Sequence, residues 1–160
     1  MERRDLLNLG GIAAIAGIFG AAADSSAQEL PAGAGKKVLR IYADAAGNSH
    51  VQELPIATQA GKIRRTETAP VTGLSYADYT ASSVEDWHRT PARQFSISLS
   101  GEIEVEVSDG QKHAIHAGDI VFLEDLQGKG HITRIKSPVT NIFIRVADGF
   151  DVVKWSRGEA

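Results

Sequence analysis

The chain has 160 residues, with 42% hydrophobic and 23% charged residues and a formal net charge of −3 at pH 7. This length suits one domain, and the composition is that of a globular protein rather than a disordered one. Acidic and basic residues are mixed along the chain, so we expect contact neither with nucleic acid nor with an anionic membrane surface. The sequence has no cysteine, which excludes disulfides, thiolate metal sites and a cysteine nucleophile.

The first 27 residues have the pattern of an export signal. Arg3 and Arg4 give a positive start, residues 9–23 form an uncharged run, and small residues at 25–27 offer a cleavage site. The uncharged run is too short and too weakly hydrophobic to predict a membrane span. We therefore expect residues 1–27 to be removed on export to the periplasm, and we expect no membrane contact by the processed protein.

The two adjacent arginines resemble a twin-arginine signal, which serves a route that carries folded proteins. Two alternatives stay open, namely an ordinary secretory signal that holds two arginines and an uncleaved anchor. Residues 28–35 follow the signal and contain one proline and two glycines. This composition predicts a flexible lead-in to the domain.

The rest of the chain has the pattern of short β-strands separated by turn residues. Strands are predicted over residues 38–43, 51–56, 94–100, 102–107, 112–115, 120–123, 142–146 and 152–155, and one more begins at residue 131. The stretch between the second and third of these strands is interpreted as loop with some strand, and no helix is expected. The clearest signal is the period of two over residues 94–107, followed by an Asp109-Gly110 hairpin turn. Together these features predict an all-β barrel or sandwich over residues 36–157.

Residues 87–134 resemble the conserved core of the cupin superfamily. Gly101 fits the glycine of that family's first motif, and Gly118 with Asp119 fits the start of its second motif. The alternating run at residues 102–107 lies between these motifs, where the family has a strand. The resemblance implies a single cupin, or jelly-roll, β-barrel that holds a small organic molecule inside.

The metal ligands of the family map onto four positions of this sequence. His88 and His131 stand at histidine positions, whereas Thr90 replaces a second histidine and Gln94 replaces a glutamate. The resemblance therefore implies a divalent metal ion held by His88, Gln94 and His131. His50 is a candidate for a third imidazole if its strand lines the same barrel. Imidazole suits iron, manganese, zinc, nickel or copper, and the sequence does not choose among them. The alternative is that His88 is a hydrogen-bonded pocket histidine without a metal.

The strand at residues 94–100 has a polar and an apolar face. Ser96 and Ser98 share a face with Gln94, because side chains alternate along a strand. The opposite face consists of the apolar residues Phe95, Ile97 and Leu99. Alternation alone leaves open which face lines the barrel, and the resemblance favours the serines, which we assign to substrate binding. An outward apolar face needs a cover, and cupins commonly pair, so we expect a homodimer.

Four charged or aromatic residues flank the expected pocket. Arg93 is assigned to binding a substrate carboxylate at the rim and Trp87 to lining the mouth, with a solvated strand end and a packing residue as the respective alternatives. Glu124 and Asp125 are adjacent carboxylates, a pairing that can serve acid–base catalysis. Glu124 is the better candidate because it stands at a motif position, and the alternative is that both are solvated.

Three functions fit these residues. The first is an exported metal-dependent enzyme that acts on a small organic molecule, in the manner of a dioxygenase, isomerase or lyase, as the resemblance implies. The second is a non-catalytic module that binds a small molecule without a metal. The third is metal-free acid–base catalysis by the histidines.

Overall fold

The computed structural model describes residues 36–59 and 65–159, so the predicted signal (1–27) and lead-in (28–35) lie outside the described residues. The strands are β1 (Lys37–Ala43), β2 (Ser49–Pro55), β3 (Val71–Tyr79), β4 (Val84–His88), β5 (Gln94–Ser100), β6 (Glu102–Val107), β7 (Lys112–His116), β8 (Ile120–Glu124), β9 (His131–Ile135) and β10 (Val139–Val146). The helix α1 (Val152–Arg157) follows them.

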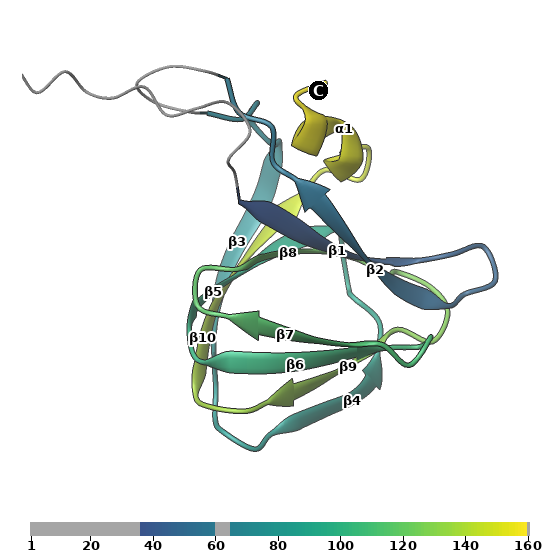
Figure 1. Cartoon of the computed structure of the whole chain (residues 1–160), viewed down its shortest axis with the longest axis vertical. Coiled ribbons are helices and arrows are strands. Elements are labelled where there is room, and N and C mark those ends of the chain that lie inside the picture. Colours follow the sequence, from purple (N-terminus) through teal and green to yellow (C-terminus); the bar gives the residue numbers. More distant parts are fainter. Residues whose placement is uncertain (1–35, 60–64, 160) are drawn as a thin grey trace, which may run out of the picture.

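The strands form two sheets that face each other (Figure 1). One sheet has the strand order β2-β1-β8-β5-β10-β3, and the other has the order β4-β9-β6-β7. Neighbouring strands pair antiparallel except β1 and β8, which pair in parallel. Two packed sheets of this kind confirm the predicted all-β, jelly-roll class of fold.

The six-stranded sheet is covered on both faces. Its inner face and the facing four-stranded sheet share one apolar core, which includes Ile41, Val105 and Leu123. Its outer face forms a second core with α1, in which Phe95 packs edge-on against Phe122 at 4.9 Å between ring centroids. Figure 1 shows α1 outside the barrel, against this outer face. The second core explains why a central strand such as β8 has apolar residues on both of its faces.

The strand predicted at residues 152–155 is wrong, because this segment is the helix α1. The side chain of Asp151 accepts hydrogen bonds from the backbone N–H groups of Val153 and Lys154, which caps the first turn. Gly158 ends the helix with φ 73°, a conformation that glycine adopts without strain. With only this short helix, the described residues contain no helix long and apolar enough to cross a membrane.

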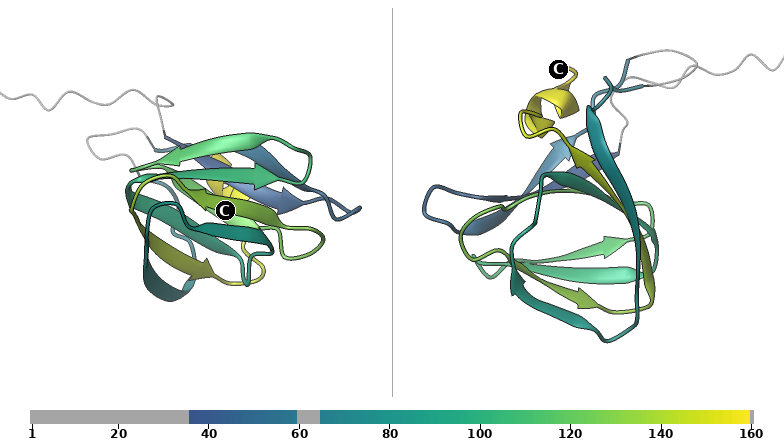
Figure 2. Two further views of the ribbon diagram at one scale, coloured as in Figure 1. Left: turned by 90° about the horizontal axis from the view of Figure 1, so that it is seen from below. Right: turned by 180° about the vertical axis from the view of Figure 1, so that it is seen from behind.

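Two strands, β3 and β4, were not predicted as such from the sequence. Each lies at one edge of its sheet, and most of the residues of β3 are exposed. An edge strand with little burial needs no regular apolar alternation. Its sequence therefore lacks the period of two from which the other strands are predicted. Figure 2 shows these two strands from other directions. Their inner residues Ser75, Ala77 and Glu85 nevertheless line the cavity described below.

The polar face of β5 points into the barrel, and its apolar face points outward. Gln94, Ser96 and Ser98 line the interior, whereas Phe95 lies under α1. The predicted cover for Phe95 is therefore supplied by the chain's own helix rather than by a partner. Leu99 remains 52% exposed, so the homodimer stays a prediction that now depends on the far end of β5 and its neighbours.

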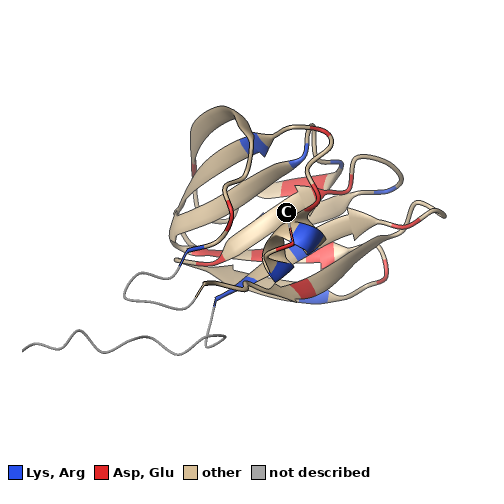
Figure 3. Cartoon of the chain, turned by 90° about the horizontal axis from the view of Figure 1, so that it is seen from above, with Lys and Arg blue, Asp and Glu red and all other residues tan. Residues whose placement is uncertain are grey.

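The outer face of the four-stranded sheet is charged. Glu104 and Glu106 on β6 contact Arg134 on β9, with 2.7 Å between the guanidinium of Arg134 and Glu106. Lys136 holds the pKa of Glu104 below its usual range by a side-chain hydrogen bond, and Arg134 does the same for Glu106. Figure 3 shows charges of both signs spread over the strands. This sheet therefore has one solvated face and one face toward the cavity, which accounts for the alternation in β6.

Candidate functional site

A cavity of about 370 Å³ lies between the two sheets, at the small end of the usual range for ligand pockets. Aliphatic side chains of both sheets form much of its wall, among them Ile41, Ile103, Val105, Ile115, Val121 and Leu123. The polar lining includes His88, Thr90, Gln94, Ser96, Ser98 and His131. The cavity can therefore hold a mainly apolar molecule that carries a few polar groups.

His88 and His131 are brought together by strand pairing. His88 ends β4, His131 begins β9, and the two residues are register partners. Their ring centroids lie 4.4 Å apart with the planes tilted by 58°. The Nδ1 of His88 lies 2.8 Å from the carbonyl oxygen of Asp86. Because a carbonyl only accepts, this Nδ1 carries the proton and Nε2 is the acceptor atom of the ring.

Asp125 holds His131 in place. Its Oδ2 lies 2.6 Å from the Nδ1 of His131, and its side chain is fully buried. Since an ionised carboxylate only accepts hydrogen bonds, Nδ1 donates, and Nε2 is left to meet a ligand in the cavity. The geometry is that of a histidine oriented by a buried carboxylate.

Thr90 completes this arrangement. Its hydroxyl donates to the Oδ1 of Asp125 at 2.6 Å, and the residue is 4% exposed. Both carboxylate oxygens of Asp125 are thereby bonded inside the protein. The position where the cupin resemblance expects a second histidine thus supports the carboxylate behind His131.

The loop before His131 is held tightly against the pocket. The hydroxyl of Ser49 donates to the carbonyl oxygen of Gly130 at 2.6 Å. Gly128 approaches Gly47 so closely that a Cβ on Gly128 would lie 2.0 Å from the Gly47 carbonyl oxygen. These contacts fix the start of β9 and with it the position of His131.

Glu124, the predicted acid–base residue, does not line the cavity. On β8 the side chains of Val121 and Leu123 face the cavity, so Glu124 faces the other way. There it contacts the Nε of Arg40, and its Oε2 lies 3.4 Å from the guanidinium of Arg93. The prediction for Glu124 is wrong in placement, and the carboxylate beside the pocket is its neighbour Asp125.

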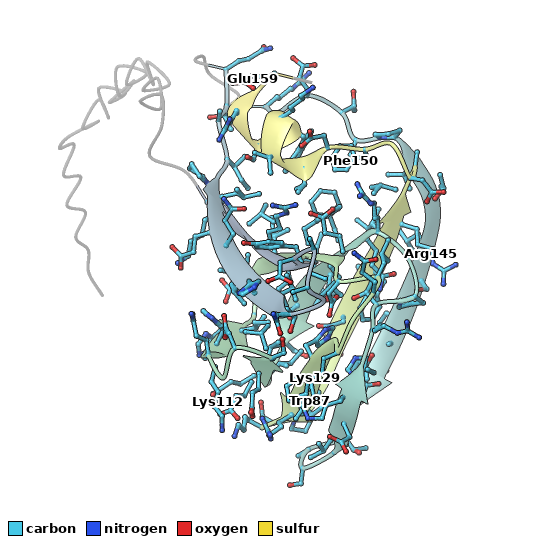
Figure 4. The ribbon with its side chains drawn as sticks, turned by 90° about the vertical axis from the view of Figure 1, so that its right-hand side faces the viewer. Trp87, Lys112, Lys129, Arg145, Phe150 and Glu159 are labelled. Carbon is cyan, nitrogen blue, oxygen red and sulfur yellow. The ribbon has the colours of Figure 1, made fainter. Side chains whose placement is uncertain are left out.

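Arg93 likewise lies on the outer side and not at the cavity rim. Besides Glu124, it donates to the carbonyl oxygen of Phe150 at 3.0 Å, which links β5 to the segment before α1. Figure 4 shows Phe150 under the helix. Arg93 is therefore occupied with the second core, and the predicted contact with a substrate carboxylate is not supported by its position.

His50 does not join the other histidines, because its side of the β1–β2 pair faces away from the cavity. It lies opposite Tyr42, whereas the adjacent Ile41 lines the cavity. The Nε2 of His50 lies 3.0 Å from Asp44 and its Nδ1 lies 3.0 Å from Asp109. Both hydrogen bonds raise the pKa of His50, and the bond to Asp44 has the larger effect. The bond from His50 is also the main cause that lowers the pKa of Asp44 to about 2.

Trp87 does not line the cavity either. The ammonium of Lys129 lies 3.6 Å from the centroid of its ring, a cation–π contact. Figure 4 shows the two side chains together, at the opposite side of the barrel from α1. Trp87 thus packs on the loop that precedes His131 and supports the site from outside.

Of the expected metal ligands, His88, Gln94 and His131 line the cavity and His50 does not, so a bound metal ion stays a prediction. Among residues 36–59 and 65–159, no three histidine or carboxylate side chains gather with the geometry of a metal site. His88 and His131 supply two imidazoles and Gln94 an amide, which is a weak ligand. The missing carboxylate and the displaced His50 leave this set short of the four ligands that a closed site uses.

Asn141, Arg145 and Glu85 are polar or charged cavity residues that the sequence did not indicate. Asn141 and Arg145 share the inner face of β10, and Glu85 comes from β4. Glu85 on β4 and Arg145 on β10, next to β3, are exposed members of the lining, so we place the mouth of the cavity at these two residues. The period of two in residues 141–146 would have placed Asn141 and Arg145 on one face, but it could not show which face is inside.

Fold and site together define a small β-barrel, cupin-like in fold, whose cavity carries a paired histidine and a buried carboxylate. No family model matches the chain. Among curated proteins it is similar to oryzines biosynthesis cluster protein J of Aspergillus oryzae (strain ATCC 42149 / RIB 40), with 38% identity over 47 residues. The match covers 29% of this chain and 26% of that protein, so the chain spans about a quarter of that relative's length.

Solved structures of similar shape have low sequence identity to this chain. A cupin-2 domain protein of Shewanella frigidimarina NCIMB 400 has 14% identity and a TM-score of 0.38, covering 53% of this chain and 85% of its own. A putative ethanolamine utilization protein Q of Salmonella typhimurium LT2 has 12% identity and a TM-score of 0.40, covering 71% and 98%. A predicted oxalate decarboxylase of Thermotoga maritima has 13% identity and a TM-score of 0.38, covering 69% and 94%. These likenesses concern the fold alone.

Proposed function

We propose that this protein binds a small organic molecule in its cavity and exchanges a proton with it through His131. The observation that carries the proposal is the 2.6 Å contact between the buried Oδ2 of Asp125 and the Nδ1 of His131. A buried carboxylate that orients an imidazole is the arrangement by which enzymes hold a histidine as general base.

The chemistry follows from the two ring nitrogens of His131. Asp125 keeps the proton on Nδ1, so the neutral ring presents the lone pair of Nε2 to the cavity. When Nε2 takes a proton from the ligand, the imidazolium is stabilised by the adjacent carboxylate, and the same proton can be returned to another atom of the ligand. The aliphatic wall lowers the local polarity, which strengthens these charge interactions.

His88 is the second imidazole at this site. Its Nε2 is the acceptor atom, and it lies 3.9 Å from a carboxylate oxygen of Glu85. Two imidazoles in ring contact would repel each other if both were positively charged, so we assign at most one positive charge to the pair in the working state. His88 then binds or polarises the ligand while His131 moves the proton.

The test uses deuterium exchange into a bound ligand. Untagged protein is incubated in D₂O with a library of small organic acids, alcohols and ketones, and each compound's mass is followed. We expect one compound to gain deuterium, with the rate reduced at least about 100-fold in Asp125→Asn and His131→Gln. His116→Gln, which changes an exposed histidine on β7, is the matched control and should exchange at the wild-type rate.

Two other outcomes decide between the competing functions. A compound that binds without exchange would make the protein a non-catalytic binding module. Stoichiometric metal in the untagged protein, lost in both His88→Ala and His131→Ala, would instead make it a metal-dependent protein and overturn the metal-free proposal. Elemental analysis of the same samples gives this second answer directly.

We also propose that the chain is exported to the periplasm by the twin-arginine route, which carries proteins that have already folded. Support comes from the charge and hydropathy pattern of the first 27 residues. Fractionation of cells that express the full chain tests it. Replacing Arg3 and Arg4 together by lysine should retain the protein in the cytoplasm, whereas unchanged export would exclude the twin-arginine route.

A further inference from the structure

We infer that the ligand is a monocarboxylate with an apolar body and a hydroxyl group at its far end, held by Arg145 and Asn141. This inference rests on the proposed function, because it names the class of molecule that the same cavity takes. It is carried by one unpaired polar atom inside the cavity and one cation at its mouth.

The unpaired atom is the amide oxygen of Asn141. Asn141 lines the cavity, is 3% exposed, and donates from its Nδ2 to the Ser96 hydroxyl at 3.3 Å. Its Oδ1 is buried and has no hydrogen-bond partner among the described residues. A buried acceptor without a partner is destabilising, and buried polar groups are almost always bonded. A ligand hydroxyl that donates to Oδ1 would satisfy it.

The cation is Arg145 at the mouth. Arg40, Arg93 and Arg134 each pair with a carboxylate, whereas in the described ranges no carboxylate pairs with Arg145. The Cδ of Arg145 lies over Gly73, 3.8 Å from where a Cβ would stand, so the missing side chain of Gly73 makes room for it. Figure 4 places Arg145 beside β10 and β3. A guanidinium in this position suits a ligand carboxylate.

The spacing of the two groups gives the ligand its shape. Asn141 and Arg145 lie four residues apart on one strand, which corresponds to about 13 Å between their Cα atoms. Phe143 lies between them on the same face, and Leu123 and Val121 also line the cavity. The middle of the ligand is therefore apolar, with the carboxylate and the hydroxyl at opposite ends.

The number of carboxylates follows from the charge at the mouth. Glu85 is an exposed lining residue on β4, an edge strand of the four-stranded sheet. Its carboxylate would repel a second ligand carboxylate. One cation and one acid at the opening thus favour a single carboxylate bound at Arg145. A hydroxyphenyl alkanoate has the required groups and order.

Four probes separate the two contacts. Calorimetry would compare 3-(4-hydroxyphenyl)propanoate with its carboxamide, with 3-phenylpropanoate, and with 3-phenylpropanamide. We expect the hydroxy acid to bind best, and loss of either the charge or the hydroxyl to weaken binding about tenfold or more. Arg145→Gln should abolish the difference between acid and amide. Asn141→Leu should abolish the difference between hydroxylated and plain rings.

The same four probes serve the control variant, and they also give the results that would overturn the inference. Arg157→Gln changes an exposed arginine on α1 that does not line the cavity, and it should leave all four affinities unchanged. Equal binding of acid and amide, an acid preference that survives Arg145→Gln, or no binding of any probe would overturn the ligand class. Probe binding without deuterium exchange would instead remove the acid–base proposal and keep the ligand class, so the two failures are distinguishable.

Discussion

The carbonyl oxygen of His88 lies directly against the α-carbon of Gly130, only 1.9 Å from where a Cβ on Gly130 would stand. Gly130 has φ 76°, in the left-handed region that favours glycine. The end of β4 and the start of β9 can therefore meet only because this residue has no side chain. The contact between His88 and His131 depends on that close approach.

Gly130→Ala should therefore disrupt the site. The added methyl group must push the His88 backbone away, so we expect loss of ligand binding together with a lower melting temperature. Gly110→Ala is the matched control, because Gly110 also has positive φ, 89°, but has open space around its Cβ position. It should cost about 1–2 kcal/mol of stability from the backbone alone and leave binding intact. Equal binding losses in the two variants would contradict this account.

Glu124→Gln should affect stability and not the cavity. The change removes the negative charge that Arg40 and Arg93 share outside the barrel, so we expect a loss of about 1–3 kcal/mol in the free energy of unfolding. Ligand affinity and proton exchange should stay at wild-type values, in contrast to Asp125→Asn. Denaturant unfolding measures the stability, and the deuterium-exchange assay measures the effect on the cavity. A loss of exchange in Glu124→Gln would show that Glu124 takes part in the proton transfer.

The contacts of His50 predict a pH-dependent stability. Its pKa is raised above the usual 6.5, so its bonds stabilise the fold below that value and the effect is lost as the pH rises through the raised pKa. The pKa of Asp44 is lowered from 3.8 to about 2, so its contribution is present above 3.8 and is lost as the pH falls toward 2. Both contributions are complete only between about pH 3.8 and 6.5.

The matching experiment compares the melting temperature of His50→Gln with that of the wild type from pH 3 to pH 9. The difference should be largest between about pH 3.8 and 6.5 and should shrink at higher pH. His116→Gln is the control, since His116 lies 3.7 Å from a single carboxylate, that of Asp119. A difference for His50→Gln that is constant over the whole range would exclude the carboxylate pairing as its cause.

Substitutions of Trp155 test how much the second core contributes to the free energy of unfolding. Its ring lies 5.3 Å from that of Phe95, and its indole N–H donates to the carbonyl oxygen of Glu67 at 2.7 Å. Trp155→Ala should lower the free energy of unfolding by about 3–5 kcal/mol. Trp155→Phe keeps most of the apolar contact and should cost less. Denaturant unfolding measures both, and similar losses would mean that the hydrogen bond, rather than packing, dominates.

Much of the fold was predictable because the strands that carry it are half-buried. In β5 and β6 the alternation of polar and apolar residues marks strands directly. The cupin resemblance then placed His88 and His131 at one pocket, and the structure has their rings in contact. The same signals failed for β3, whose exposed edge shows no alternation, and for α1, whose six residues are too few for a helical period to appear.

The sequence by itself determined the all-β class of fold, from local alternation, and the absence of thiol chemistry, from residue types, whereas the resemblance to cupins predicted the pair of histidines at the pocket. Only the tertiary structure placed Asp125, rather than Glu124, against a histidine of the cavity, and Arg145, rather than Arg93, in the cavity lining. Neighbouring residues on a strand point to opposite faces, and both faces of this sheet are buried in apolar cores. Hydrophobicity therefore cannot show which face is the inside, and only the pairing of distant strands does.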